Sequence, residues 1–147
     1  MREAVFRVDA SQEIGAGHTM RCLTLADALT EAGWRCSFAV GPQTLAIVSD
    51  LRKAPYEVLE LSGDRIQPMQ ERWPEGIDLL VIDHYDLGAA YEVACRPWAR
   101  KIFVIDDLAR RIHPCDLLLD LNLVRAQSSY AWLVSPAWPV LIGPDYS

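Results

Sequence analysis

The chain has 147 residues, of which 51% are hydrophobic and 23% charged, and its formal net charge is −6. This length allows one domain with one core, and the acidic balance argues against nucleic acid, which recruits basic surfaces. No apolar run reaches the roughly 18 residues that a membrane span needs, and the N-terminus lacks a signal-peptide pattern. We therefore expect a single cytoplasmic domain over residues 1–147, with neither a membrane nor a nucleic acid as partner.

The four cysteines form no CxxC pair, and their spacing suggests neither a zinc site nor a small disulfide framework. They are Cys22, Cys36, Cys95 and Cys115. We interpret them as reduced thiols of the core, which is the usual state in the cytoplasm.

The first half of the chain alternates short β-branched runs with helical patterns. A strand at residues 4–9 precedes a helix at 17–32, and Gly33 follows as a C-cap glycine would. One face of this helix is expected to carry Cys22, Leu25, Leu29 and Ala32. The next predicted elements are a strand at 35–40, a helix at 42–54 and a strand at 56–61.

The second half continues the alternation after a polar, Pro-rich segment at 62–76, to which we assign a short helix and a loop. The elements predicted after it are a strand at 77–85, a helix from 87 to about 97, strands at 101–107 and 115–123, one helical turn at 128–134 and a strand at 139–146. Strands that alternate with helices favour a parallel sheet covered on both faces. With right-handed crossovers, the fold class is α/β, a Rossmann-like doubly wound sheet.

Ligands of such sheets bind beyond the carboxyl ends of the strands, so the residues that follow each strand are the candidates for a site. Three strands deliver polar residues to this edge. They are Asp9 and Ser11 with the glycine turn, then Asp83, His84 and Tyr85, and finally Asp106 and Asp107. A site at this edge is the prediction, although acidic residues at strand ends also cap helices or bind a divalent metal.

The turn IGAGH, residues 14–18, departs from the dinucleotide fingerprint GxGxxG. Gly15 and Gly17 are present, but Met20 stands where the third glycine belongs, and the second strand ends without an acidic residue for a ribose. We therefore do not expect a dinucleotide cofactor. The two glycines still allow a tight turn and a close approach of the backbone to a ligand.

His18 lies in the first turn of the helix that follows. The positive end of the helix dipole disfavours an imidazolium, so a neutral ring that can accept a proton is expected there. The alternative is a structural histidine bonded to a nearby carbonyl. Arg7, which alternates with Asp9 on the first strand, also has two interpretations. It is either part of a buried ion pair or a side chain that holds the glycine turn.

Four blocks of the sequence together resemble a known family. They are RVDASQEIGAGHTMRCLTLADAL, VIDHYDLGAAYE, FVIDDLARRIHPCDLLLDLN and LIGPDYS. The resemblance is to the UDP-2,4-diacetamido-2,4,6-trideoxy-β-L-altropyranose hydrolases of pseudaminic acid synthesis and to related spore-coat polysaccharide proteins. It implies the N-terminal half of a GT-B fold, in which two Rossmann-like domains face a cleft.

The resemblance also implies a reaction and a set of residues. Water attacks C1 of a UDP-linked deoxyamino sugar with inversion, His18 is the general base, and no cofactor or metal is required. Gly15, Gly17 and Tyr85 match positions on the sugar side of the cleft. Asp9 or Ser11 is expected to orient the imidazole or the water, and Asp83 and Asp106 are expected to contact substrate.

Members of this family are about twice as long as this chain. We therefore expect residues 1–147 to be the sugar-side domain alone, without the C-terminal nucleotide-binding domain that completes the cleft, and to hydrolyse UDP-sugar poorly. Two alternatives stay open at this point. One is the acceptor-side domain of a MurG-like glycosyltransferase, and the other is a non-catalytic binding domain of the same fold.

Overall fold

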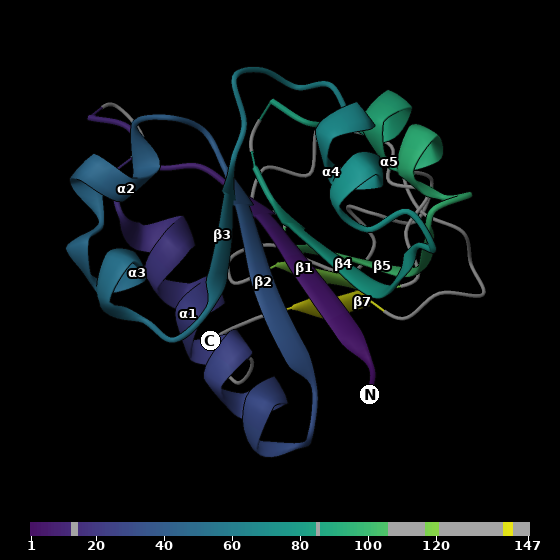
Figure 1. Ribbon diagram of the computed structural model, residues 1–147, viewed down its shortest axis with the longest axis horizontal. Coiled ribbons are helices and arrows are strands. Elements are labelled where there is room, and N and C mark those ends of the chain that lie inside the picture. The colour runs from purple at the N-terminus through teal and green to yellow at the C-terminus, as the bar shows by residue number, and fades with distance from the viewer. Residues whose placement is uncertain (13–14, 85, 106–116, 121–139, 143–147) are drawn as a thin grey trace.

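The computed structural model describes residues 1–12, 15–84, 86–105, 117–120 and 140–142. Within these residues, seven strands form one sheet in the order β3-β2-β1-β4-β5-β6-β7, and every neighbouring pair is parallel. The strands are β1 (Glu3–Val8), β2 (Arg35–Val40), β3 (Glu57–Glu60), β4 (Ile77–Asp83), β5 (Ala99–Ile105), β6 (Leu117–Asp120) and β7 (Val140–Ile142). The predicted α/β class with a Rossmann-like parallel sheet is confirmed (Figure 1).

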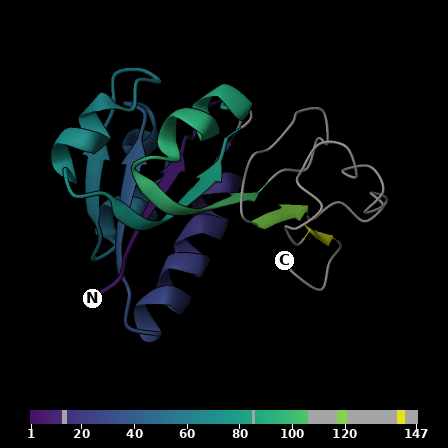
Figure 2. The same ribbon diagram turned by 90° about the vertical axis from the view of Figure 1, so that its right-hand side faces the viewer.

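In the described part of the chain, five helices cover the two faces of the sheet. They are α1 (Gly17–Glu31), α2 (Thr44–Ile47), α3 (Ser49–Lys53), α4 (Gln67–Arg72) and α5 (Ala89–Cys95). Figure 1 shows α1, α2 and α3 on one side of the strands and α4 and α5 on the other, and Figure 2 shows the same layers from the side. The chain winds outward from β1 to β3 and then returns past β1 to β4 and β5. Because right-handed crossovers in opposite directions place their helices on opposite faces, this order explains the two layers.

Alternation along β1 supplies both cores. Ala4, Phe6 and Val8 face the core beneath α1, whereas Val5 faces the core beneath α4 and α5. Phe6 stacks on Phe38 of β2 with ring centroids 5.0 Å apart. Since successive side chains of a strand point to opposite faces, a strand buried on both sides is apolar almost throughout, as in parallel sheets.

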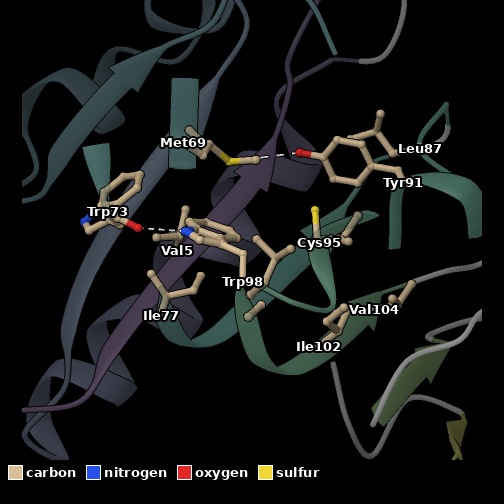
Figure 3. Packing of buried hydrophobic residues seen from close by; sticks show 14 of the residues in the cluster. Val5, Met69, Trp73, Ile77, Leu87, Tyr91, Cys95, Trp98, Ile102 and Val104 are labelled. Atoms are coloured by element: carbon tan, nitrogen blue, oxygen red, sulfur yellow. Dashed lines mark hydrogen bonds between the residues drawn. The ribbon is translucent and has the colours of Figure 1, made fainter. Parts of the chain in front are cut away.

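The core beneath α4 and α5 is built around two tryptophans (Figure 3). The indole Nε1 of Trp98 donates a hydrogen bond of 2.8 Å to the carbonyl oxygen of Trp73, which satisfies the polar atom that Trp98 brings into the core. Tyr91 of α5 points its hydroxyl at the sulfur of Met69 in α4, at 4.0 Å. The two helices are thereby joined across the top of this core.

The helix predicted at residues 42–54 is two helices, and the prediction of a single element was wrong. The break falls at Val48, which has φ −109° and ψ 87°. Val48 and Leu51 are both buried in the core beneath α1, so the chain leaves helical geometry where packing draws these residues inward.

The buried face of α1 also differs from the prediction. The buried residues are His18, Thr19, Cys22, Leu23 and Ala26, while Leu25 and Leu29 are partly buried and Ala32 is exposed. The predicted face considered only apolar residues, and the helix instead turns two polar residues of its first turn toward the sheet.

The other predicted elements within the described residues are confirmed to within about two residues at most ends, and the short helix expected in 62–76 is α4. The helical turn predicted at 128–134 lies outside the described residues. Cys22, Cys36 and Cys95 are buried and form no disulfide, whereas Cys115 lies outside the described residues.

Candidate active site

The ends of β1 and β4 lie side by side at the carboxyl edge of the sheet. Val8, the last residue of β1, is in register with Asp83, the last residue of β4. This register brings Asp9 and His84, which follow the two strands, into direct contact. The structure therefore places several predicted site residues at one edge, and Tyr85 and Asp106 lie outside the described residues.

His18 contacts the carboxylate of Asp83 in the first turn of α1. Its Nδ1 is 2.6 Å from Oδ1 of Asp83 and 3.4 Å from the backbone oxygen of the same residue. Arg21, one helical turn further on, donates hydrogen bonds to the same carboxylate, from Nε to Oδ2 and from Nη2 to Oδ1. The thiol of Cys22 lies 3.8 Å from Oδ2. We call Arg21, Asp83 and His18 the α1-side triplet.

The Asp83 contact assigns the protons of the His18 ring. A carboxylate accepts hydrogen bonds and cannot donate them, so Nδ1 carries the hydrogen that points at Asp83. In the neutral ring Nε2 then carries the lone pair that accepts a proton.

A second triplet lies on the opposite face of the sheet. Nη1 of Arg7 donates to Oδ1 of Asp9 at 2.8 Å, and Oδ2 of Asp9 is 2.6 Å from Nε2 of His84. Arg7 is only 1% exposed, so the ion-pair interpretation of this residue is correct. We call Arg7, Asp9 and His84 the cavity-side triplet.

The cavity-side triplet determines the charge of Asp9. Burial alone would raise the pKa of this carboxyl, but the hydrogen bonds from His84 and Arg7, the charge of Arg7 and the backbone N–H of Gly41 hold it well below its usual range. The Gly41 N–H lies 2.5 Å from Oδ1. A Cβ at residue 41 would lie 3.0 Å from the same oxygen, so a glycine here permits the close approach.

Both ring nitrogens of His84 are engaged within this network. Nδ1 accepts the backbone N–H of Asp86 at 3.0 Å, so Nε2 carries the hydrogen that points at Asp9. The two contacts hold the ring of His84 in one orientation beside Asp9.

An open cavity of about 340 Å³ lies over the ends of β1 and β2. The residues that line it include three aspartates, Asp9, Asp64 and Asp86, together with Ser11, Thr44 and His84. His18 does not line this cavity and its side chain is 9% exposed, although Asp83, which holds it, directly precedes His84 in the sequence.

The glycine turn leads from β1 into α1. Gly15 has φ +82°, a conformation that L residues rarely adopt, and its N–H donates to the carbonyl of Ser11 at 2.7 Å. Gly17 is the first residue of α1, so His18 lies in the first turn of the helix, as expected. The turn thus determines where along the sheet edge His18 lies.

Two features of the site were absent from the prediction. One is that the carboxylate of Asp83 contacts the imidazole of His18, while Asp9 contacts His84 on the other face of the sheet. Arg21 was not singled out at all. The signal for it was present in the sequence, since residues three apart on a helix share a face and Arg21 follows His18 by three.

No group of three or more His, Cys, Asp or Glu side chains that could hold a metal occurs among the residues that the structure describes. In the same part of the chain, no helix is both long and apolar enough to cross a membrane.

The fold and the site together define a class, a Rossmann-like α/β domain with a histidine–carboxylate pair at the carboxyl edge of its sheet. No family model matches the chain. Among curated proteins, the chain is similar to the UDP-2,4-diacetamido-2,4,6-trideoxy-β-L-altropyranose hydrolase of Campylobacter jejuni, with 33% identity over 147 residues. The alignment covers 99% of this chain and 51% of that relative, so the chain spans about half the relative's length. The resemblance seen in the sequence motifs is confirmed over nearly the whole chain.

Proposed function

We propose that this chain is the sugar-side domain of an enzyme that releases UDP from a UDP-linked 2,4-diacetamido-2,4,6-trideoxyhexose by hydrolysis. The similarity to the Campylobacter hydrolase supports the substrate class. The single observation that carries the chemistry is the contact of 2.6 Å between Nδ1 of His18 and the buried carboxylate of Asp83.

In the proposed reaction, Nε2 of His18 takes a proton from water as the water oxygen attacks C1 of the sugar. The C1–O bond on the opposite face breaks, and its electron pair leaves with the β-phosphate oxygen of UDP, so the configuration at C1 inverts. Asp83 stabilises the imidazolium that forms and keeps the ring in the required tautomer. Because UDP is a good leaving group, a strong general acid is not needed.

The cavity over the ends of β1 and β2 fits the sugar better than the nucleotide. With three aspartates in the lining and one arginine, Arg7, paired to Asp9, the cavity disfavours a pyrophosphate, whereas sugar hydroxyl and acetamido groups can hydrogen-bond to Asp64, Asp86 and Ser11. We therefore place the sugar at this edge, close to Gly15, Gly17 and the predicted residues Tyr85 and Asp106. The nucleotide is assigned to a second domain that completes a GT-B cleft, in keeping with the greater length of the relative.

UDP release measured in a coupled assay tests this proposal. In a protein that contains both domains, His18→Ala should lower turnover by about 10²-fold or more, the usual size of a general-base contribution. The 147-residue chain alone should release UDP poorly. Unchanged turnover in His18→Ala favours the non-catalytic binding domain, and rapid release by the chain alone contradicts the two-domain cleft.

Product analysis separates hydrolysis from glycosyl transfer, since the same base could activate an alcohol in place of water. We expect the free sugar as product whether or not candidate acceptor alcohols are present. A glycoside formed in preference to the free sugar would assign the domain to a glycosyltransferase. Cytoplasmic localisation stays a prediction from the sequence.

A further inference from the structure

We propose that Arg21 is a positioning residue for His18: it serves as the counter-ion of the Asp83 carboxylate that both side chains contact, so that the imidazole need not fill that role. The catalytic meaning of this inference rests on the proposed function. The coupling between Arg21, Asp83 and the His18 ring can be tested without a measurement of turnover.

The carboxylate of Asp83 is completely buried between α1 and the end of β4. It is 0% exposed and receives both Nε and Nη2 of Arg21, together with Nδ1 of His18. A buried carboxylate is unstable without a positive partner. If Arg21 were absent, the nearest group able to become positive would be His18, through uptake of a second proton.

Arg21 removes that requirement. Its guanidinium forms a two-point ion pair with Asp83, so the carboxylate is already neutralised when His18 is neutral. Arg21 therefore supplies the positive partner that the Asp83 carboxylate needs, in a site where the His18 side chain is only 9% exposed.

Among the described residues around α1, the other ionisable groups leave this pairing unchanged. The pKa of the Cys22 thiol is raised well above its usual range by burial and by the charge of Asp83, so the thiol adds no charge. On the β1 and β4 side, Arg7 and Asp9 neutralise each other and His84 is held between Asp9 and the Asp86 N–H. On α3 and β2 the charged residues are all exposed, and they are Asp50, Arg52, Lys53 and Arg35.

The first experiment needs no substitution in the triplet. Long-range ¹H–¹⁵N NMR correlations of the ¹⁵N-labelled 147-residue chain report which nitrogen of each histidine carries hydrogen, and a His18→Gln variant assigns the signals. We expect the Nδ1–H tautomer for His18 and the Nε2–H tautomer for His84. An Nε2–H tautomer at His18 overturns the inference, because Asp83 then receives no hydrogen from the ring.

The second experiment follows the same signals with pH and predicts shifts of opposite sign. Arg21→Met should raise the pH at which His18 titrates by about one unit or more, because the Asp83 charge is then unopposed. Asp83→Asn should lower it, because only the positive charge of Arg21 remains. Arg21→Lys, which keeps the charge, should lie close to the unsubstituted chain, and His84 should move little in all three variants.

A shift of the same sign in Arg21→Met and Asp83→Asn, or no shift in Arg21→Met, overturns the inference. If Arg21→Met does not fold, Asp83→Asn decides it, because a His18 titration that stays unchanged or rises in that variant overturns the inference. Turnover separates this inference from the proposed function. Unchanged turnover in His18→Ala, with the titration shifts as stated, contradicts the proposed base and leaves the charge coupling intact. Turnover that depends on His18, with a pH profile that Arg21→Met does not move to higher pH, contradicts the coupling alone.

Discussion

The two faces of the sheet carry the same three side-chain types in the same order of contact, an arginine, an aspartate and a histidine. In the α1-side triplet the carboxylate of Asp83 meets Nδ1 of His18. In the cavity-side triplet the carboxylate of Asp9 meets Nε2 of His84, whose Nδ1 accepts a backbone N–H. The two histidines therefore differ although their neighbours are of the same types. The difference lies in which ring nitrogen faces the carboxylate and in what the other nitrogen contacts.

Burial differs between the triplets in a way that affects stability. Arg7 is 1% exposed while its partner Asp9 is 21% exposed, and in the α1-side triplet the order is reversed, with Asp83 at 0% and Arg21 at 26%. Each triplet thus has one charged group that cannot reach water. In the cavity-side triplet this group is the guanidinium of Arg7, and in the α1-side triplet it is the carboxylate of Asp83. Removal of equivalent residues should therefore have unequal effects.

The largest difference is expected when the carboxylates are removed. Asp9→Ala leaves the guanidinium of Arg7 buried without its main partner and should lower the free energy of unfolding by about 3–5 kcal/mol. Asp83→Ala leaves Arg21, which is partly exposed and can turn to solvent, so a loss of about 1–3 kcal/mol is expected. Urea unfolding at pH 7 measures both, and equal losses would show that the burial of the arginine is not what matters.

Acid should reveal the same ion pair through its pH dependence. The pKa of Asp9 is lowered in the folded state, so the stability it contributes is present above the pKa of an unfolded aspartate, about 3.9, and is lost as the pH falls below it. Asp9→Asn should therefore cost about 2 kcal/mol at pH 7 and progressively less toward pH 2. Asp27→Asn serves as the exposed control. A cost for Asp9→Asn that does not change with pH contradicts this account.

Much of the fold was predictable because it depends on local patterns. β-branched runs that alternate with helical segments determine the parallel sheet and its layers, and a parallel sheet brings the ends of its strands to one edge. The meeting of Asp9 with His84 needed in addition the strand order, which places β1 next to β4. Sequence alone gives the order of elements along the chain but not this neighbourhood.

The pairing of His18 with Asp83 could not be predicted, because it depends on two rotations that tertiary packing decides. One is the face of β4 that carries Asp83, and the other is the rotation of α1 about its axis. The apolar pattern of α1 centres on Leu25 and Leu29, but the helix buries His18 and Thr19 instead. This rotation of α1 accompanies the contacts of His18 and Arg21 with Asp83 at the end of β4.

A smaller effect should distinguish the two histidines as structural elements. His84→Gln removes a ring that is bonded at both nitrogens and should lower the free energy of unfolding by about 1–2 kcal/mol. His18→Gln should cost less, because Arg21 and Cys22 still satisfy Asp83. Thermal unfolding of the two variants checks this order. A larger loss of stability in His18→Gln than in His84→Gln would indicate that His18 has a mainly structural role.

The smallest effect concerns the fourth side chain at Asp83. Cys22 donates a weak hydrogen bond to Oδ2 at 3.8 Å, and Cys22→Ala should cost about 1 kcal/mol in urea unfolding. Cys36→Ala is the matched control, because the buried Cys36 thiol also bonds weakly, at 3.6 Å, to a carbonyl that belongs to neither triplet. The two losses should be similar, and only Cys22→Ala should alter the His18 signals, slightly. If Cys22→Ala moved the His18 titration as far as Arg21→Met does, the Cys22 thiol would stabilise the Asp83 charge as strongly as Arg21. The α1-side triplet would then depend on a fourth residue.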